Sequence, residues 1–138
     1  MDKIYNIYQI NSFLFDAKVI HLSVVENNKA RSCPIEMHMY YDHKLMFAIG
    51  TDNPLYQSMK TNPHICLTAY RNDRKWFRYT GKAVFEDDPR YSQMMIRRCS
   101  TLTRYYNNTT GYQLMMFHLE DSSSYIIDEF NNTFRTTI

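Results

Sequence analysis

The chain has 138 residues and a formal net charge of +2, with 16 basic against 14 acidic side chains, so we expect one domain over residues 1–138 and no surface for nucleic acid. No apolar run reaches the roughly 20 residues of a membrane-spanning helix, and the first residues lack the pattern of a signal peptide. Three widely spaced cysteines indicate free thiols in a reducing, cytoplasmic compartment, and three isolated glycines exclude the glycine-rich loops of Rossmann dehydrogenases and P-loop NTPases.

The first half of the chain predicts a short helix followed by strands that turn back on one another. Helical spacing of apolar residues favours a helix over residues 4–14, and an apolar run predicts a strand over residues 19–25. The alternation from Ala30 to Tyr41 predicts one long strand, which a turn joins to a further strand over residues 45–49. One face of the long strand is expected to carry Ile35, Met37, Met39 and Tyr41, and the other Glu36, His38 and Tyr40.

The second half predicts two more helices among further strands. Asn53-Pro54 and Asp88-Pro89 each combine a capping side chain with proline at the first helical position. Strands are expected over residues 65–70, 76–85, 113–119 and 125–129. Because the strands follow one another mostly in hairpins, without a βαβ rhythm, we predict a mainly β fold: an antiparallel barrel of about six strands with short flanking helices.

The sequence lacks the motifs of several kinds of catalytic and metal-binding site. The five histidines form no HxxxH pair and have no cysteine at ligand spacing, so no metal site is expected. There is no GxSxG motif, and Cys33 has no histidine nearby in the sequence to activate it. The acidic run Glu86-Asp87-Asp88 is typical of a turn and a helix cap. No catalytic residue is therefore identified.

The turn between residues 49 and 54 is a candidate anion site. A strand ends at Gly50 and leads at once into the first turn of a helix, whose unpaired N–H groups suit a phosphate together with Thr51 and Asn53. An ordinary capped junction between a strand and a helix has the same pattern, so this turn alone does not decide between the two interpretations.

The strand over residues 76–85 has one apolar face and one face of mixed chemistry. Trp76, Arg78, Thr80 and Lys82 alternate with Phe77, Tyr79, Gly81, Ala83 and Phe85. An aromatic ring beside two cations suits a planar anionic ligand or a partner subunit. The solvated side of a half-buried strand is the competing interpretation. Together with a methionine-rich face at Met37 and Met39, this surface predicts a homodimer.

These segments together resemble the pyridoxamine 5′-phosphate oxidase-like family of FMN-binding split barrels. The resemblance lies in Phe47–Thr51, Tyr56–Pro63 and Trp76–Phe85, with the strand start at Ala30–Pro34, and it extends from Val19 to Asp128. It implies a six-stranded antiparallel split β-barrel that forms a homodimer with FMN at the subunit interface. In such proteins the strand at Arg31, Ser32, Cys33 and Pro34 lies along the flavin ring. Ile49, Gly50, Thr51 and Asn53 lie near the phosphate, Tyr56 completes this part of the site, and Trp76 and Arg78 help to form the interface.

Three departures from the family pattern shape the expected function. Cys33 stands where relatives often carry arginine, Asn53 where they often carry lysine, and the tail Asn131–Ile138 lacks the Arg-Leu pair of true pyridoxamine phosphate oxidases. We therefore expect a flavin-dependent oxidoreductase that acts on an unidentified small molecule and is not a true pyridoxamine phosphate oxidase. The alternative is a non-catalytic module that stores or senses a flavin or haem.

Overall fold

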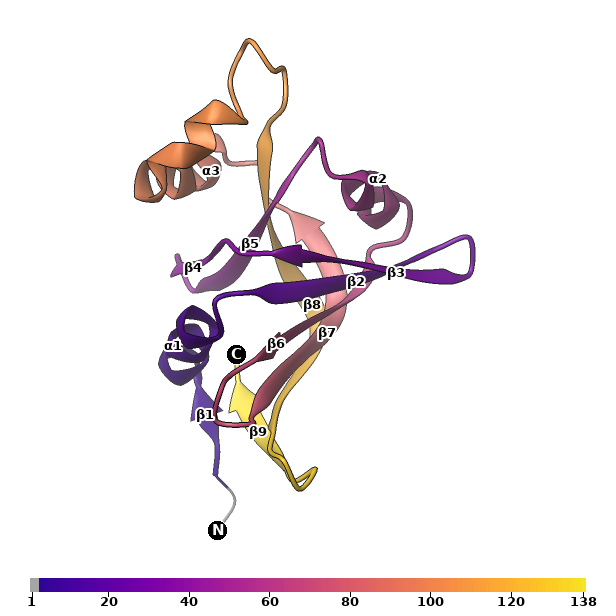
Figure 1. The fold of residues 1–138 in the computed structure, drawn as a ribbon, viewed down its shortest axis with the longest axis vertical. Coiled ribbons are helices and arrows are strands. Elements are labelled where there is room, and N and C mark those ends of the chain that lie inside the picture. The colour runs from indigo at the N-terminus through magenta and orange to yellow at the C-terminus, as the bar shows by residue number, and fades with distance from the viewer. Residues whose placement is uncertain (1–2) are drawn as a thin grey trace.

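The computed structural model describes residues 3–138 and places a strongly curved sheet at the centre, with helices at its ends and flank (Figure 1). The helices are α1 (Ile7–Ala17), α2 (Pro54–Thr61) and α3 (Pro89–Arg98), and α3 is followed by the 3₁₀ helix η1 (Ser100–Arg104). The strands are β1 (Tyr5–Asn6), β2 (Ile20–Glu26), β3 (Lys29–Ile35), β4 (His38–Tyr41), β5 (Lys44–Gly50), β6 (His64–Tyr70), β7 (Trp76–Phe85), β8 (Leu114–Ile127) and β9 (Thr133–Thr137). None of the helices in this part of the chain is long and apolar enough to cross a membrane.

The sheet is antiparallel apart from one short parallel pair. Its strands follow the order β1-β9-β8-β7-β6-β2-β3, and β8 also pairs with β5, which pairs with β4. Among the strands of residues 3–138, only β1 and β9 run parallel. Because β3 pairs with β2 alone among the described strands, its other side is an open edge. The predicted class, a mainly β antiparallel split barrel with flanking helices, is confirmed, with nine strands in place of six.

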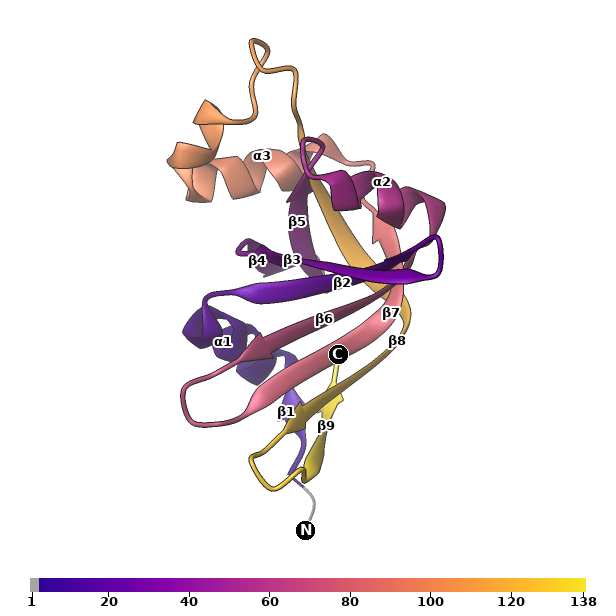
Figure 2. The same cartoon turned by 45° about the vertical axis from the view of Figure 1, so that its right-hand side comes forward.

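Strand β8 is a single long strand where we predicted two (Figure 2). Its first residues pair with β5, and the remainder continues along β7, with a shift in register between Thr80 and Lys82. Gly81 permits this irregularity, because a Cβ atom there would lie 2.9 Å from the backbone oxygen of Glu120. Of the polar residues between the two predicted strands, Glu120, Ser123 and Ser124 pair with β7, and the Thr80 and Ser123 hydroxyls lie 3.2 Å apart. Residues 133–137, for which we predicted no strand, form β9.

The main core fills the inner face of the barrel. Leu22, Leu67 and Tyr79 form one row across β2, β6 and β7, and all three are buried. Phe77 is fully buried beside them, so the predicted apolar face of residues 76–85 is confirmed. Helix α1 closes one end of this core, although it begins later than predicted because Asn6 forms a capping box with Gln9.

A second core, rich in methionine, lies between α3 and the sheet of β4, β5 and β8. Thioether side chains fill irregular gaps well, because they are unbranched and polarisable. Met39 is only 1% exposed in this core, so the prediction that it forms part of a dimer surface is wrong. The buried members of this cluster are Met39, Met46, Ala48, Tyr91, Met95, Leu114 and Met116.

The predicted long strand over residues 30–41 is broken at Glu36 and Met37. The chain changes partner there, since β3 pairs with β2 whereas β4 pairs with β5. The side-chain alternation does not continue across the break. Within β4 both His38 and Met39 are buried, whereas Tyr41, predicted to share a face with Met39, is 47% exposed at the end of the strand, next to the turn.

His38 is a buried ionisable group held by packing. Its ring lies against Phe15, with ring centroids 4.5 Å apart, and its Nε2 has no hydrogen-bond partner within residues 3–138. Burial lowers the pKa of His38, and a hydrogen bond with the backbone of Asn11 opposes part of this effect. The neutral imidazole is therefore the form that fits the fold.

We expect the free energy of unfolding to fall as the pH drops below about 6.5, the usual pKa of histidine in an unfolded chain. Below that pH His38 binds a proton in the unfolded chain but not in the folded one. The contribution of neutral His38 to the free energy of unfolding is therefore complete above that pH, and it is lost as the pH falls through the lower pKa of the folded state. Urea unfolding at a series of pH values between about 5 and 8, an interval that spans the titration of one histidine, measures this loss. His38→Leu should flatten the profile, whereas the exposed His43→Asn should not; equal profiles for the two variants would contradict the assignment.

Candidate functional site

The turn after β5 and the edge strand β3 meet through a direct side-chain contact. Asn53 Nδ2 donates a hydrogen bond to Cys33 Sγ at 3.4 Å, and Asn53 Oδ1 accepts one from Leu55 N at 3.0 Å, which caps α2. The first contact joins residues 20 positions apart in the chain. Figure 2 shows α2 above the β2–β3 hairpin. The two sequence segments that the family resemblance places around a flavin thus lie side by side.

Most backbone donors of this turn are already used within the protein. Thr51 N donates to Gln113 O at 2.9 Å, Asn53 N donates to Gly50 O at 3.0 Å, and Leu55 N donates to the Asn53 cap. Thr51 Oγ1 accepts from Gln113 N at 3.0 Å and keeps its own proton for another acceptor. A phosphate at this turn would therefore depend on side chains more than on the helix N-terminus.

Arg31 is the cation nearest to this contact along β3. It lies two residues before Cys33, on the same face of the strand, at a spacing of about 7 Å. Its guanidinium pairs with Glu26 at 2.5 Å, and a hydrogen bond from Arg31 lowers the pKa of that carboxyl. Both side chains are well exposed, so their pairing is weak and leaves the guanidinium available to a stronger anion.

Four more of the predicted residues, Ser32, Pro34, Trp76 and Arg78, lie on the outer face of the sheet. The Arg78 guanidinium lies 5.7 Å from the Trp76 ring centroid and 5.8 Å from that of Tyr125. Pro34 lies in the same row across the sheet as Arg78, with Thr68 of β6 and His21 of β2 between them. Three strand spacings separate Pro34 from Arg78, a distance of about 14 Å. Ser32 points to this same outer face, because its partner in β2 is Ser23. The predicted set is therefore divided between the two sides of β3.

Two of the predicted side chains serve packing. Ile49 is 2% exposed and belongs to the main core, and Tyr56 packs edge-on against Phe85, with ring centroids 5.1 Å apart. Gly50 is also covered: a Cβ atom there would lie 2.2 Å from the hydroxyl of Tyr106. Tyr106 and Gln113, which complete the turn, were not predicted from the sequence. They come from the segment before β8, and no local pattern links that segment to residue 50.

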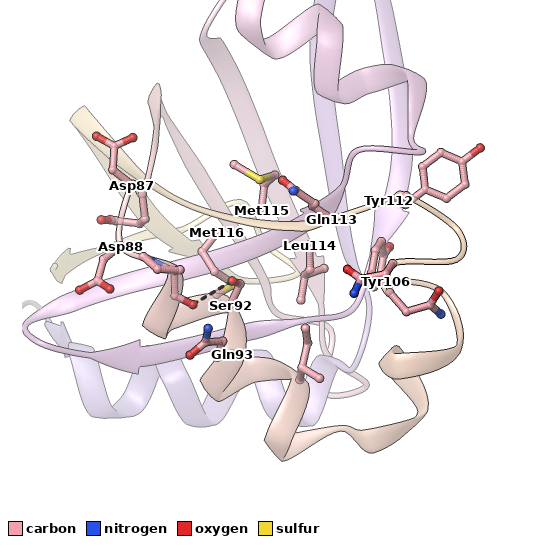
Figure 3. Close-up of a pocket in the computed structure, with 16 residues that line it drawn as sticks. Asp87, Asp88, Ser92, Gln93, Tyr106, Tyr112, Gln113, Leu114, Met115 and Met116 are labelled. Atoms are coloured by element: carbon pink, nitrogen blue, oxygen red, sulfur yellow. Dashed lines mark hydrogen bonds between the residues drawn. The ribbon is translucent and has the colours of Figure 1, made fainter.

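A large cavity lies next to this turn, between α3, the segment before β8, and the start of β8 (Figure 3). Its volume is about 620 Å³, within the usual range for small-molecule sites. Tyr106 and Gln113 belong both to its wall and to the packing of the Gly50–Asn53 turn. Burial and the neighbouring Asp52 raise the pKa of Tyr106, so its hydroxyl stays protonated.

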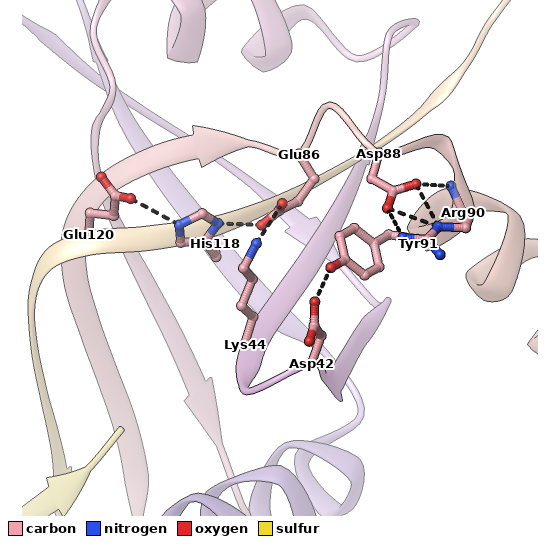
Figure 4. A network of polar contacts seen from close by, with 8 residues as sticks. All are labelled: Asp42, Lys44, Glu86, Asp88, Arg90, Tyr91, His118 and Glu120. Atoms are coloured by element: carbon pink, nitrogen blue, oxygen red, sulfur yellow. Dashed lines mark hydrogen bonds and ion pairs between the residues drawn. The ribbon is translucent and has the colours of Figure 1, made fainter.

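A polar network joins α3 to the sheet (Figure 4). Glu86 Oε1 pairs with His118 Nδ1, and Glu86 Oε2 accepts from Lys44 Nζ at 3.1 Å. The Tyr91 hydroxyl donates to Asp42 at 2.5 Å, and this hydrogen bond raises the pKa of Tyr91 to about 12. The sequence predicted only a turn and a cap around Glu86. Asp88 is the cap of α3, whereas Glu86 connects β5, β7 and β8.

No metal site is formed by the described part of the chain. Within residues 3–138, no three or more histidine, cysteine, aspartate or glutamate side chains gather closely enough to hold an ion. His38 is buried and His43 is exposed in the turn after β4, so these two rings lie in different environments.

Known proteins resemble this chain in structure. No family model matches the sequence, and no curated protein matches it. A NimC/NimA family protein from Clostridium acetobutylicum has a TM-score of 0.80 at 20% identity, over 92% of this chain and 91% of that chain. A protein related to general stress protein 26, of the pyridoxinephosphate oxidase family and from the same organism, has a TM-score of 0.68 at 17% identity, over 93% and 92%. An FAD-binding protein from Mesorhizobium loti has a TM-score of 0.59 at 14% identity, over 86% and 92%.

A haem-binding protein from Mycobacterium smegmatis also shares the fold, with a TM-score of 0.69 at 7% identity, over 92% of this chain and 55% of that chain. The chain thus has the fold of the pyridoxamine 5′-phosphate oxidase-like split barrels, as its sequence segments predicted. At such identities the likeness concerns the fold, and function has to be argued from the site.

Proposed function

We propose that this chain binds FMN where the edge strand β3 meets the Gly50–Asn53 turn, and that it acts as a flavin-dependent oxidoreductase on a small molecule. The observation that carries the proposal is the contact between Asn53 and Cys33. It places an exposed strand edge beside a turn in a fold that an FAD-binding protein shares. The open edge of β3 offers backbone donors and acceptors to the rim of a flat heterocycle.

The residues at this junction fit a monophosphate through one cation and a hydroxyl. Arg31 would supply the charge, and Thr51 Oγ1 would supply a donor. The Asp52 carboxylate lies in the same turn, beside the Gly50 backbone, and disfavours a second phosphate group there. When bound, the flavin would supply the electron-transfer chemistry, while this chain would bind it, orient it and shield it from water.

FMN is expected to bind more tightly than riboflavin or FAD. Riboflavin lacks the phosphate that Arg31 would neutralise, and FAD adds a second phosphate near Asp52. Titrating flavin-free protein with the three compounds, followed by flavin fluorescence, measures the order. A charge-assisted contact is worth about 1.5–3 kcal/mol, so the loss for riboflavin should be about tenfold or more. Equal affinities for FMN and riboflavin would show that the phosphate site is not used.

We also propose a homodimer in which a second copy covers the outer sheet face. Trp76 and Arg78 lie there on β7, partly exposed, and β6 and β2 separate them from the free edge of β3 on the same sheet. Covering this edge would complete a flavin site from both sides of the strand. Light scattering at micromolar concentration should give twice the 16.6 kDa of one chain. The mass of a single chain would refute the dimer.

The second candidate function is a non-catalytic module that holds a flavin or haem. The haem-binding protein that shares the fold is the observation that favours it. The visible spectrum of the purified protein separates the cofactors, because oxidised flavin and haem absorb in different bands. Reduction of bound flavin by a nicotinamide donor, followed by reoxidation with a small acceptor, would support the oxidoreductase over the storage module.

A further inference from the structure

The cavity beside α3 has two chemically different ends. Figure 3 shows Asp87 and Asp88 at one end and Tyr106 and Tyr112 at the other. Leu114 and Met116 from β8 lie behind the wall between them, buried in the methionine-rich core, and the half-buried Ile96 and Met115 supply the accessible apolar surface. A ligand that matches this cavity has an apolar body and one polar end.

The charge of the lining sets the sign of that polar end. Three of the lining residues are acidic and none is lysine or arginine. Glu86 is balanced by Lys44 and His118, and Asp88 by Arg90 at 2.6 Å. Asp87 has no ion-pair partner within residues 3–138, so its carboxylate gives the acidic end a net negative charge. That end favours a cation and disfavours an anion.

Two residues that line the cavity also contact the turn at which we place the flavin phosphate. The Tyr106 hydroxyl covers Gly50, and Gln113 exchanges hydrogen bonds with Thr51 through both backbone groups. A molecule in the cavity therefore lies next to the residues that would hold the flavin. The aromatic end of the cavity is the end closer to that turn.

We propose that this cavity binds a small organic cation, namely a protonated amine carried by an aromatic body. The ammonium group lies at Asp87, and the ring lies at the end formed by Tyr106 and Tyr112, against the apolar wall of Ile96 and Met115. If the proposed flavin site is correct, this cation is the class of small molecule on which the flavin acts. That part of the proposal rests on the proposed function. The binding site itself depends only on the cavity.

Two probes of similar shape and opposite charge test the proposal: 2-phenylethylamine and 3-phenylpropionate. NMR titration of the full chain, with and without FMN, should show the amine binding about tenfold more tightly than the acid. Asp87→Asn should weaken amine binding about two- to fivefold, the range for a solvent-exposed charge pair. Asp121→Asn removes an exposed carboxylate elsewhere and should leave it unchanged. Equal binding of both probes, or equal effects of both variants, would overturn the proposal.

A variant whose cavity is filled by a larger side chain tests the amine site separately from the flavin site. Ser92→Phe places a ring in the cavity, away from the Gly50–Asn53 turn, and should abolish amine binding while FMN binding persists. Asp87→Asn, at an exposed position, keeps the test valid should Ser92→Phe fail to fold. Amine binding without any FMN binding would support the cavity and sink the flavin proposal. FMN binding without preference for the amine would sink the cavity proposal alone.

Discussion

Glu86→Ala is expected to lower the free energy of unfolding by about 2–3 kcal/mol, because it removes a carboxylate that both His118 and Lys44 contact. The Glu86 side chain is 8% exposed and that of His118 is 17% exposed, so water replaces the lost contacts poorly. Lys44 is 37% exposed and can turn to solvent, which keeps the loss below the cost of breaking a fully buried pair. Urea denaturation at neutral pH measures the change.

Glu120→Ala is the matched control for this experiment. Glu120 contacts the other nitrogen of the same imidazole, at 3.3 Å, but its side chain is 58% exposed. An exposed pair contributes about 0–1 kcal/mol, so this variant should stay close to the parent protein. Losses of the same size in both variants would mean that burial of Glu86 does not determine the strength of the network.

Cys33→Arg is expected to tighten FMN binding by about 5- to 30-fold, which corresponds to about 1–2 kcal/mol. The half-buried Cys33 thiol touches Asn53, so a longer side chain at this position starts beside the turn, on the edge strand β3. Together with Arg31 on the same face, a second guanidinium would bind the phosphate from a neighbouring position. Flavin fluorescence titration measures the affinity.

Cys33→Ser serves as the control, because it keeps a small polar group near Asn53 and adds no charge. Its FMN affinity should equal that of the parent protein. Thermal unfolding of both variants is measured alongside, since Cys33 also packs against the main core and an arginine forced inward would unfold the barrel. A folded Cys33→Arg variant with unchanged or weaker FMN affinity would show that the phosphate lies elsewhere.

The sequence by itself determined the features that depend on neighbours along the chain. Alternation over residues 76–85 predicted which face of β7 is buried, because side chains of a strand point to opposite sides at a period of two. Asn53 and Asp88 were identified as helix caps, because a cap bonds to a backbone group only two residues away. The segments that resemble known split barrels also gave the fold class.

Contacts between distant segments were decided only by the tertiary structure. Glu36 and Met37 interrupt an alternating pattern because the strands on either side of them pair with different partners. The polar residues Glu120, Ser123 and Ser124 belong to one continuous β8 because β7 pairs with them across the sheet. In the site, Tyr106 covers Gly50, and Glu86 meets His118, 32 residues away, and Lys44, 42 residues away. Local patterns specify the backbone and the exposed face of each segment, whereas the partner of a buried polar group depends on which segments the folded sheet brings together.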